Sequence, residues 1–89
     1  MRAVITVIGK DKIGIIYRVS EILSKYKINI EDISQTILQD VFTMVMLVDL
    51  SVSTCKFTDL KNKLEDLGKE IGMTIRIQNE DIFNAMHTI

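Results

Sequence analysis

The chain has 89 residues and a formal net charge of −1, which places it in the size range of one small domain. This charge balance argues against a nucleic-acid-binding protein, which carries a basic surface, and the apolar runs are shorter than the roughly 18 residues of a membrane helix. The sequence is strand-like by Ala3, which leaves no room for a signal peptide. Its single cysteine, Cys55, can form neither an internal disulfide nor a cysteine metal cage. We therefore expect one cytoplasmic domain over residues 1–89, with no cofactor, no metal ion, no nucleic acid and no membrane partner.

The first predicted strand, residues 2–8, is apolar on both of its faces. Such a strand is typical of the buried centre of a sheet, because half-exposed strands alternate apolar and polar residues. A polar loop between Gly9 and Gly14 follows, and an apolar stripe at spacings of three and four residues then predicts an amphipathic helix. That stripe comprises Ile15, Ile16, Val19, Ile22, Leu23 and Tyr26.

The loop between Gly9 and Gly14 is a candidate anion site. Glycine allows a tight turn and lets another molecule approach the backbone closely. A helix that begins just after Gly14 also points unpaired backbone N–H groups at the loop. These donors suit a carboxylate or another small anion.

The middle of the chain predicts two further strands. Residues 28–39 form the second, and its apolar positions change parity near Glu31 and Asp32, which predicts a bulge there. A turn at residues 39–41 leads to the third strand, residues 42–50, which is again apolar on both faces.

The last third predicts a helix, a strand and a short helical end. Leucines and other apolar residues recur every three or four positions over residues 57–71, and Gly72 is a natural stop for this helix. Residues 73–78 alternate like a half-exposed strand, and residues 82–86 have helical spacing.

In chain order these elements are βαββαβ, the pattern of an α+β, ferredoxin-like sandwich with a short C-terminal helical extension. Its four-stranded antiparallel sheet has the first and third strands at the centre, the fourth at an edge, and two helices on one face. Apolar side chains on the other face are left in water, and an exposed apolar patch of this kind marks a partner surface. These side chains are Val4, Ile8, Val45 and Leu47. We therefore expect a homodimer or larger oligomer; the alternative is a small protein that tolerates exposed aliphatic side chains.

Several proteins with this topology are excluded by the residues they need. A cluster-binding ferredoxin needs four cysteine ligands, a soft-metal carrier needs paired thiols in the first loop, and an RNA-binding sheet displays stacking aromatics on its central strands. An acylphosphatase-like hydrolase favours arginine in its anion loop. This loop has Lys10 and Lys12 instead, so that function is kept only as the weaker alternative.

The segments GKDKIGI at 9–15 and KINIEDI at 27–33 resemble those of the ACT domain, a small regulatory module that often binds amino acids. The segments DISQT at 32–36 and IFNAMHTI at 82–89 resemble more specifically the stand-alone, single-domain ACT proteins of prokaryotes. The chain is also similar to the ACT halves of glycine-cleavage regulatory proteins. The resemblance covers nearly the whole chain, which implies that residues 1–89 are a single ACT domain.

The resemblance implies a non-enzymatic regulatory or sensory module that binds an amino acid or similar metabolite at a subunit interface and signals to a separate protein target. In that family the ligand lies between the loop after the first strand of one chain and the start of the second strand of another. By position, the resemblance implies Asp11, Gly14, Ile15 and Asn29 as the ligand-binding residues. The alternative is a structural interaction domain without a ligand.

Each candidate residue has a chemical role available and a structural interpretation beside it. Gly14 and Ile15 present N–H groups to a carboxylate, Asp11 accepts a hydrogen bond from an ammonium group, and the Asn29 amide both donates and accepts. Alternatively, Asp11 caps the helix, Asn29 serves the preceding turn, and Gly14 supplies only backbone shape. His87 is interpreted as an exposed tail residue rather than as a metal ligand or catalytic base.

Overall fold

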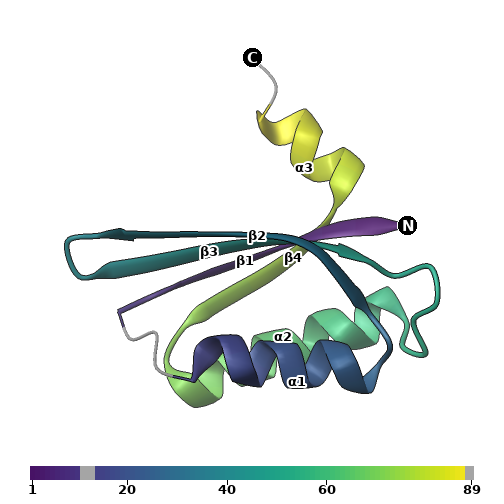
Figure 1. The fold of residues 1–89 in the computed structure, drawn as a ribbon, viewed down its shortest axis with the longest axis horizontal. Helices are drawn as coiled ribbons and strands as arrows, with labels where there is room; N and C mark the ends of the chain where they lie inside the picture. Colours follow the sequence, from purple (N-terminus) through teal and green to yellow (C-terminus); the bar gives the residue numbers. More distant parts are fainter. Residues whose placement is uncertain (11–13, 88–89) are drawn as a thin grey trace.

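The computed structural model describes residues 1–10 and 14–87, and it contains four strands and three helices in those ranges (Figure 1). In chain order they are β1 (Arg2–Gly9), α1 (Ile15–Lys25), β2 (Asn29–Leu38), β3 (Val41–Asp49), α2 (Phe57–Ile71), β4 (Thr74–Asn79) and α3 (Glu80–His87). Each predicted element is present, with ends that differ from the prediction by at most two residues.

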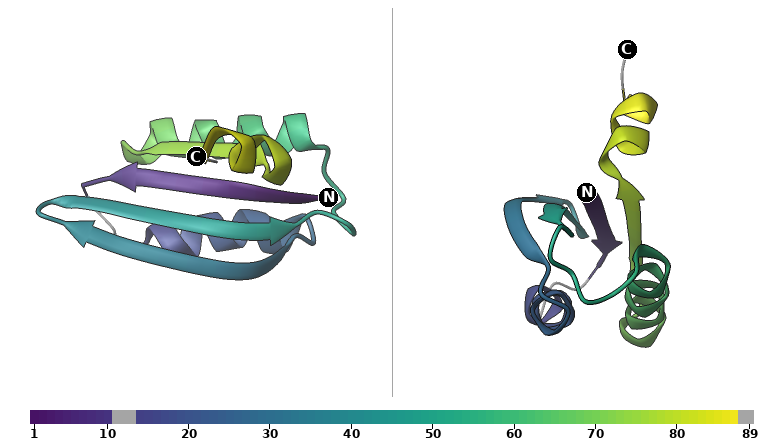
Figure 2. Two further views of the ribbon diagram at one scale, coloured as in Figure 1. Left: turned by 90° about the horizontal axis from the view of Figure 1, so that it is seen from above. Right: turned by 90° about the vertical axis from the view of Figure 1, so that its right-hand side faces the viewer.

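The four strands form one antiparallel sheet in the order β2-β3-β1-β4. The prediction that the first and third strands are central is therefore confirmed, as is the α+β ferredoxin-like architecture. Helices α1 and α2 lie side by side on one face of the sheet, and α3 stands on the other (Figure 2). The core lies between the sheet and the pair α1 and α2, where side chains of all three layers are buried.

The predicted bulge in β2 is confirmed. Ile30 pairs with Val48 and Asp32 with Leu47, so Glu31 is the extra residue that the parity change indicated. The predicted end of α2 is also confirmed: Gly72 has a left-handed φ of 73°, and its N–H donates to the Gly68 carbonyl. Glycine is favoured there because other residues are strained at positive φ.

Two predictions of exposure are corrected by the packing. Val4 was expected to face water, but only 6% of it is exposed, and α3 contacts the strand that carries it. Ile16 was assigned to the apolar stripe of the first helix, but 38% of it is exposed. Neighbouring helix residues point about 100° apart, so Ile15 takes the core position and Ile16 turns outward.

The strand β2 is exposed along most of its length, which the sequence did not predict. It is an edge strand, and the hairpin that it makes with β3 extends beyond the N-terminal end of α1 (Figure 1). Ile33 and Ile37 pair with the buried residues Met46 and Phe42, so they lie on the helix-covered side of the sheet, yet both are exposed. An apolar strip at this edge is therefore left without a covering helix.

Within residues 1–10 and 14–87, no helix has the length and apolar character that crossing a membrane requires.

Candidate functional site

The glycines at both ends of the first loop have different physical roles. Gly9 ends β1 against Met73: a Cβ atom placed on Gly9 would lie 2.5 Å from the Met73 Cγ atom. Gly14 has space around it but adopts φ 75°, the left-handed region that favours glycine. The Gly14 carbonyl accepts a 2.9 Å hydrogen bond from the N–H of Arg18, and this bond is the first of helix α1. The predicted structural role of Gly14 is thus present, whatever the loop binds. Asp11 lies outside the described residues.

The start of α1 presents backbone donors toward this loop. No described side chain caps the helix at Gly14, and its first turn contains no acidic residue. Helix N-termini leave N–H groups unpaired and carry partial positive charge, so an anion is favoured there. Ile15 belongs to this turn, but its side chain is buried in the core. Only the backbone N–H of Ile15 is therefore available to a ligand.

Asn29 is exposed at the first position of β2, as its alternation with buried Ile28 predicted. The turn before it is closed by backbone groups: the Lys27 N–H donates to Ser24 at 3.1 Å, and the Ile28 N–H donates to Leu23 at 2.9 Å. Lys27 adopts a positive φ of 58° in this turn. The turn therefore has its own hydrogen bonds, and the Asn29 side chain is placed at the surface of the sheet edge.

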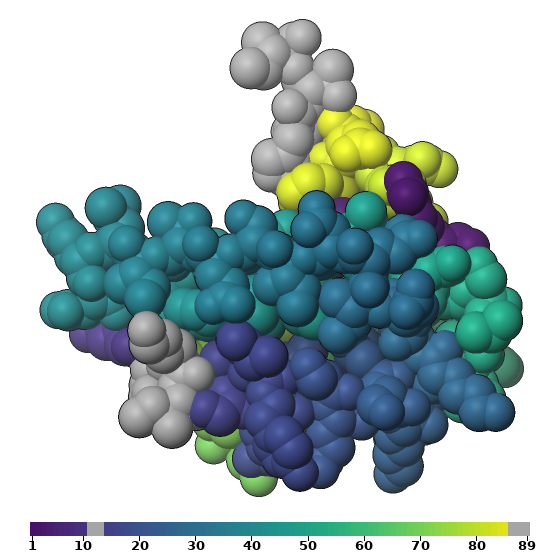
Figure 3. Space-filling model, in the orientation of Figure 1, coloured from purple at the N-terminus to yellow at the C-terminus, as the bar shows by residue number. Residues whose placement is uncertain are grey.

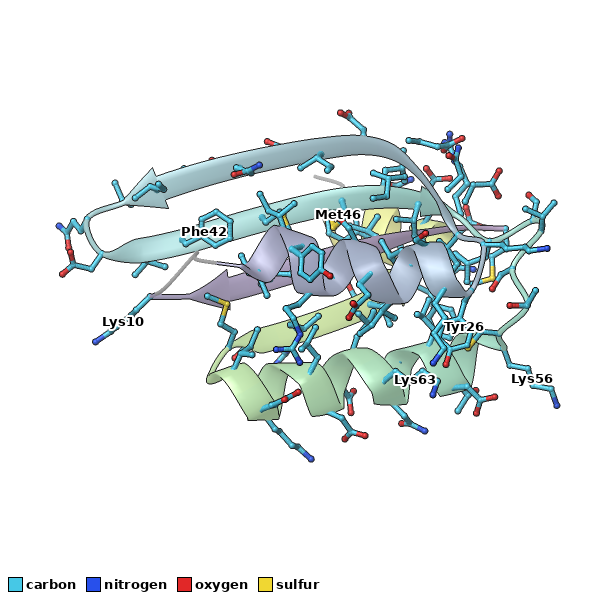
Figure 4. The ribbon with its side chains drawn as sticks, turned by 60° about the horizontal axis from the view of Figure 1, so that its bottom comes forward. Lys10, Tyr26, Phe42, Met46, Lys56 and Lys63 are labelled. Atoms are coloured by element: carbon cyan, nitrogen blue, oxygen red, sulfur yellow. The ribbon has the colours of Figure 1, made fainter. Side chains whose placement is uncertain are left out.

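A single chain does not bring the two halves of the candidate site together. Gly14 and Ile15 begin α1, whereas Asn29 follows its end, and an 11-residue helix is about 16 Å long. Figure 4 shows the separation through two labelled residues that flank α1: Lys10 before the helix and Tyr26 at its end lie far apart. In the single chain, Gly14 and Asn29 therefore lie at opposite ends of α1.

An ion-pair network that no sequence pattern indicated lies at the Asn29 end of the sheet. The Arg2 guanidinium donates to both carboxylate oxygens of Glu80, with distances of 3.2 Å from Nε and 2.6 Å from a terminal nitrogen. Its other terminal nitrogen lies 3.3 Å from the bulged residue Glu31. The hydrogen bond to Glu80 is the main cause that raises the pKa of Arg2 above its ordinary value. Arg2 thus links β1, β2 and α3, a link that follows from the sheet order and not from residue spacing.

A groove of about 560 Å³ lies between α1 and α2, and the sequence did not predict it either. Tyr26 lies at one end of it, with the ammonium groups of Lys25 and Lys63 at 5.6 Å and 5.2 Å from the ring centroid (Figure 4). A hydrogen bond with Tyr26 is the main cause that raises the pKa of Lys63. Farther along, Arg18 pairs with Glu70 at 2.8 Å. Cations and anions alternate along this groove, so it has no single charge preference.

Asp49 ends β3 beside Asn29 and is held by Ser51. Both the hydroxyl and the backbone N–H of Ser51 donate to the same Asp49 carboxylate oxygen. These bonds, the hydroxyl first, lower the pKa of Asp49 below its usual 3.8. The sharp connection after β3 is therefore tied to an ionised carboxylate.

Replacing Ser51 by alanine is expected to lower the melting temperature at pH 7 and to have little effect at about pH 2. The folded-state pKa of Asp49 is depressed, so the stability it contributes is present above its unfolded pKa and is lost as the pH falls through the folded value. Thermal melts followed by circular dichroism from pH 7 downward measure this. Ser24→Ala, at an exposed position of α1, is the control. An equal loss of stability at both pH values would contradict the assignment to Asp49.

The order of the elements and of the strands defines a ferredoxin-like βαββαβ domain. The family model of the ACT domain matches residues 2–78. A UPF0237 protein of Clostridium acetobutylicum is 57% identical over 89 residues, which cover 100% of both chains. The chain belongs to the ACT domain family, whose members are regulatory modules.

Two solved structures are similar to the chain. An ACT domain protein from Streptococcus pneumoniae is 45% identical, with a TM-score of 0.81 and 98% of each chain covered. A putative glycine cleavage system transcriptional repressor is 25% identical, with a TM-score of 0.71 over 86% of this chain and 44% of that one. This putative repressor thus contains a segment with the same fold as this chain.

Proposed function

We propose that this protein is a non-enzymatic regulatory module that binds an amino acid or a similar small metabolite between two copies of the chain. The observation that carries the proposal is the separation of the candidate residues by the full length of α1. Since neither end of the helix holds all of the required groups, a complete site needs a second chain.

The exposed edge at β2 supports an arrangement that unites the two halves. The strands β1 and β2 both pair antiparallel with β3, so they run in the same direction, and Gly9 lies at the same end of the sheet as Leu38. A second copy, related by two-fold symmetry and pairing its β2 antiparallel to this one, brings its own Asn29 to that end. Each loop is then close to the start of the other chain's β2, and the dimer holds two equivalent sites.

The β2 edge also has the unpaired backbone groups and exposed apolar side chains that are typical of an interface. An unpaired edge strand presents free N–H and C=O groups that template pairing with another strand. Ile33 and Ile37 expose apolar area on the helix side of this edge, where a second copy of α1 would cover it. Pairing therefore satisfies the backbone and the apolar strip together.

The chemistry of the two halves suits a zwitterion. The N–H groups at the start of α1 bind a carboxylate, Asp11 accepts a hydrogen bond from an ammonium group, and the Asn29 amide donates to one end and accepts from the other. Ligand binding favours the paired arrangement only by the difference in its affinity for the two states. A separate protein target would respond to that shift, because the ligand-bound dimer presents a surface that the ligand-free state presents less often.

Replacing Asn29 by alanine is expected to abolish ligand-dependent stabilisation and to leave the melting temperature of the free protein nearly unchanged. A ligand at 100 times its dissociation constant stabilises the folded state by about 2.7 kcal/mol, which a thermal-shift assay resolves. The assay screens the twenty amino acids at millimolar concentration, with glycine first because one similar structure is a putative regulator of the glycine cleavage system. Asn62→Ala, at an exposed position of α2, is the matched control.

The screen also tests the alternatives. If no amino acid stabilises the wild-type protein, the proposal of a ligand is contradicted and a structural interaction domain is favoured. Hydrolysis of a simple acyl phosphate by the purified protein would contradict the non-enzymatic assignment.

A further inference from the structure

The face of the sheet opposite α1 and α2, here called the open face, has an apolar centre and a polar rim. Its central side chains come from β1 and β3: Val4, Thr6, Ile8, Thr43, Val45 and Leu47. The edge strands contribute polar residues, such as Ser34 of β2 and Arg76 of β4. Protein interfaces combine an apolar centre with a polar rim in this way.

The helix α3 rises from the open face at one side of the sheet. It contacts only β1 and β4 among the described elements, and Figures 1 and 2 show it pointing away from the sheet instead of lying along it. In the space-filling view it stands above the rest of the surface (Figure 3). Ile82 of this helix is 57% exposed, and Ala85 is exposed as well. An isolated helix of eight residues is unstable in water, so α3 depends on its packing against β1 and β4, and its exposed apolar side chains offer a surface for a further contact.

The base of α3 is held in one orientation by the groups that surround it. Arg2 donates hydrogen bonds to both carboxylate oxygens of Glu80 in the first turn of α3. The Asn79 side chain accepts a 2.8 Å hydrogen bond from the Asp81 N–H and so caps the helix. A helix held this way enters an interface with less loss of conformational freedom than a mobile tail.

The dimensions of this surface match a second copy of the same chain. Eight helical residues span about 12 Å, and two sheets pack face to face about 10 Å apart. A helix that rises from one sheet therefore reaches the sheet packed against it. The whole open face measures roughly 500 Å², and α3 already covers part of it, so two facing sheets alone bury somewhat less than the roughly 1,000 Å² at which specific interfaces begin. The flanks of two α3 helices take the buried area beyond this limit.

We propose that two copies of this protein pack open face to open face, with α3 of each copy closing against the sheet of the other. The same chain supplies both the partly exposed apolar face and the exposed apolar side of α3, and two-fold symmetry covers both at once. This contact uses a face of the sheet, whereas the ligand-binding arrangement uses the β2 edge, so the two coexist in a tetramer. The inference does not depend on a bound ligand.

The test measures the molar mass of the full-length protein in solution by light scattering coupled to size-exclusion chromatography. Ile82→Glu and, separately, Ile8→Glu are expected to halve the mass of the wild-type tetramer and to raise the dissociation constant of the face contact roughly 100-fold or more. Both side chains are exposed in the single chain, so both variants keep the monomer fold, which circular dichroism verifies. Val52→Glu, in the connection after β3 and 69% exposed, is the matched control and is expected to retain the wild-type mass.

The outcomes separate this contact from the β2 edge. The proposal is overturned if either Ile82→Glu or Ile8→Glu has the same molar mass as the wild-type protein. It is also overturned if the wild-type protein is no larger than a dimer and this dimer dissociates only when the β2 edge is altered. Such a result would leave the proposed ligand site intact, because that site needs only the edge contact. If a different protein covers the open face, all three variants have the same molar mass as the wild-type protein. This result also overturns the proposed self-association.

Discussion

A variant with Ile33→Glu and Ile37→Glu is expected to lose the pairing of β2 edges and, with it, all ligand-dependent stabilisation. The two substitutions place four carboxylates along the interface of the proposed dimer. Juxtaposed like charges cost several kcal/mol, which corresponds to a rise of about 1,000-fold in the dissociation constant of the edge contact. This is the largest effect on assembly that the structure predicts.

The same variant should leave the fold of each chain intact. Ile33 and Ile37 lie on the helix side of β2, but 38% and 55% of them are exposed because α1 does not extend over the hairpin. Exposed positions change the free energy of unfolding by only about 0.5 kcal/mol in either direction. Sedimentation velocity over a concentration series measures the assembly, and a thermal-shift titration measures ligand binding. Val52→Glu serves as the control for an added charge on an exposed aliphatic residue.

Two results would contradict this prediction. If the variant keeps its edge contact, the β2 edge is not the interface. If it loses the contact and still binds the ligand with unchanged affinity, the site does not lie between chains.

Replacing Leu64 by alanine is expected to lower the free energy of unfolding by about 2–5 kcal/mol, through lost burial and the cavity left behind. Leu64 lies on the face of α2 that covers the sheet, and none of its surface is exposed. Small domains have a total stability of about 5–15 kcal/mol, so this single change removes a large part of it. Urea unfolding followed by circular dichroism measures the loss as a lower midpoint with an unchanged slope.

The chain has a matched control for this substitution. Leu38→Ala makes the same chemical change at the end of β2, where the leucine is exposed, and is expected to change stability by no more than about 0.5 kcal/mol. Equal effects of the two variants would contradict the placement of α2 over the core.

The residues in and around the candidate site could be predicted from the sequence to different degrees. The loop between Gly9 and Gly14 was recognisable because a glycine before an apolar stripe is a local signal, and the positive φ of Gly14 is set by the same local geometry. Asn29 was placed at the surface by its alternation with Ile28. The contact of Arg2 with Glu80 had no such signal, because 78 positions separate the two residues and only the pairing of β1 with β4 brings them together.

The sequence by itself determined the order of the elements, the central position of β1 and β3, and the bulge at Glu31, since each depends on side-chain periodicity within a few residues. Only the tertiary structure decided which apolar residues remain uncovered. Val4 is buried in a strand that α3 contacts, whereas Ile33 and Ile37 lie beyond the reach of α1. Coverage depends on where a helix ends in space relative to a strand from another part of the chain, and no local pattern encodes that position. The length of α1 likewise separates the two halves of the candidate site by about 16 Å, and this separation is the basis for the proposed site between two chains.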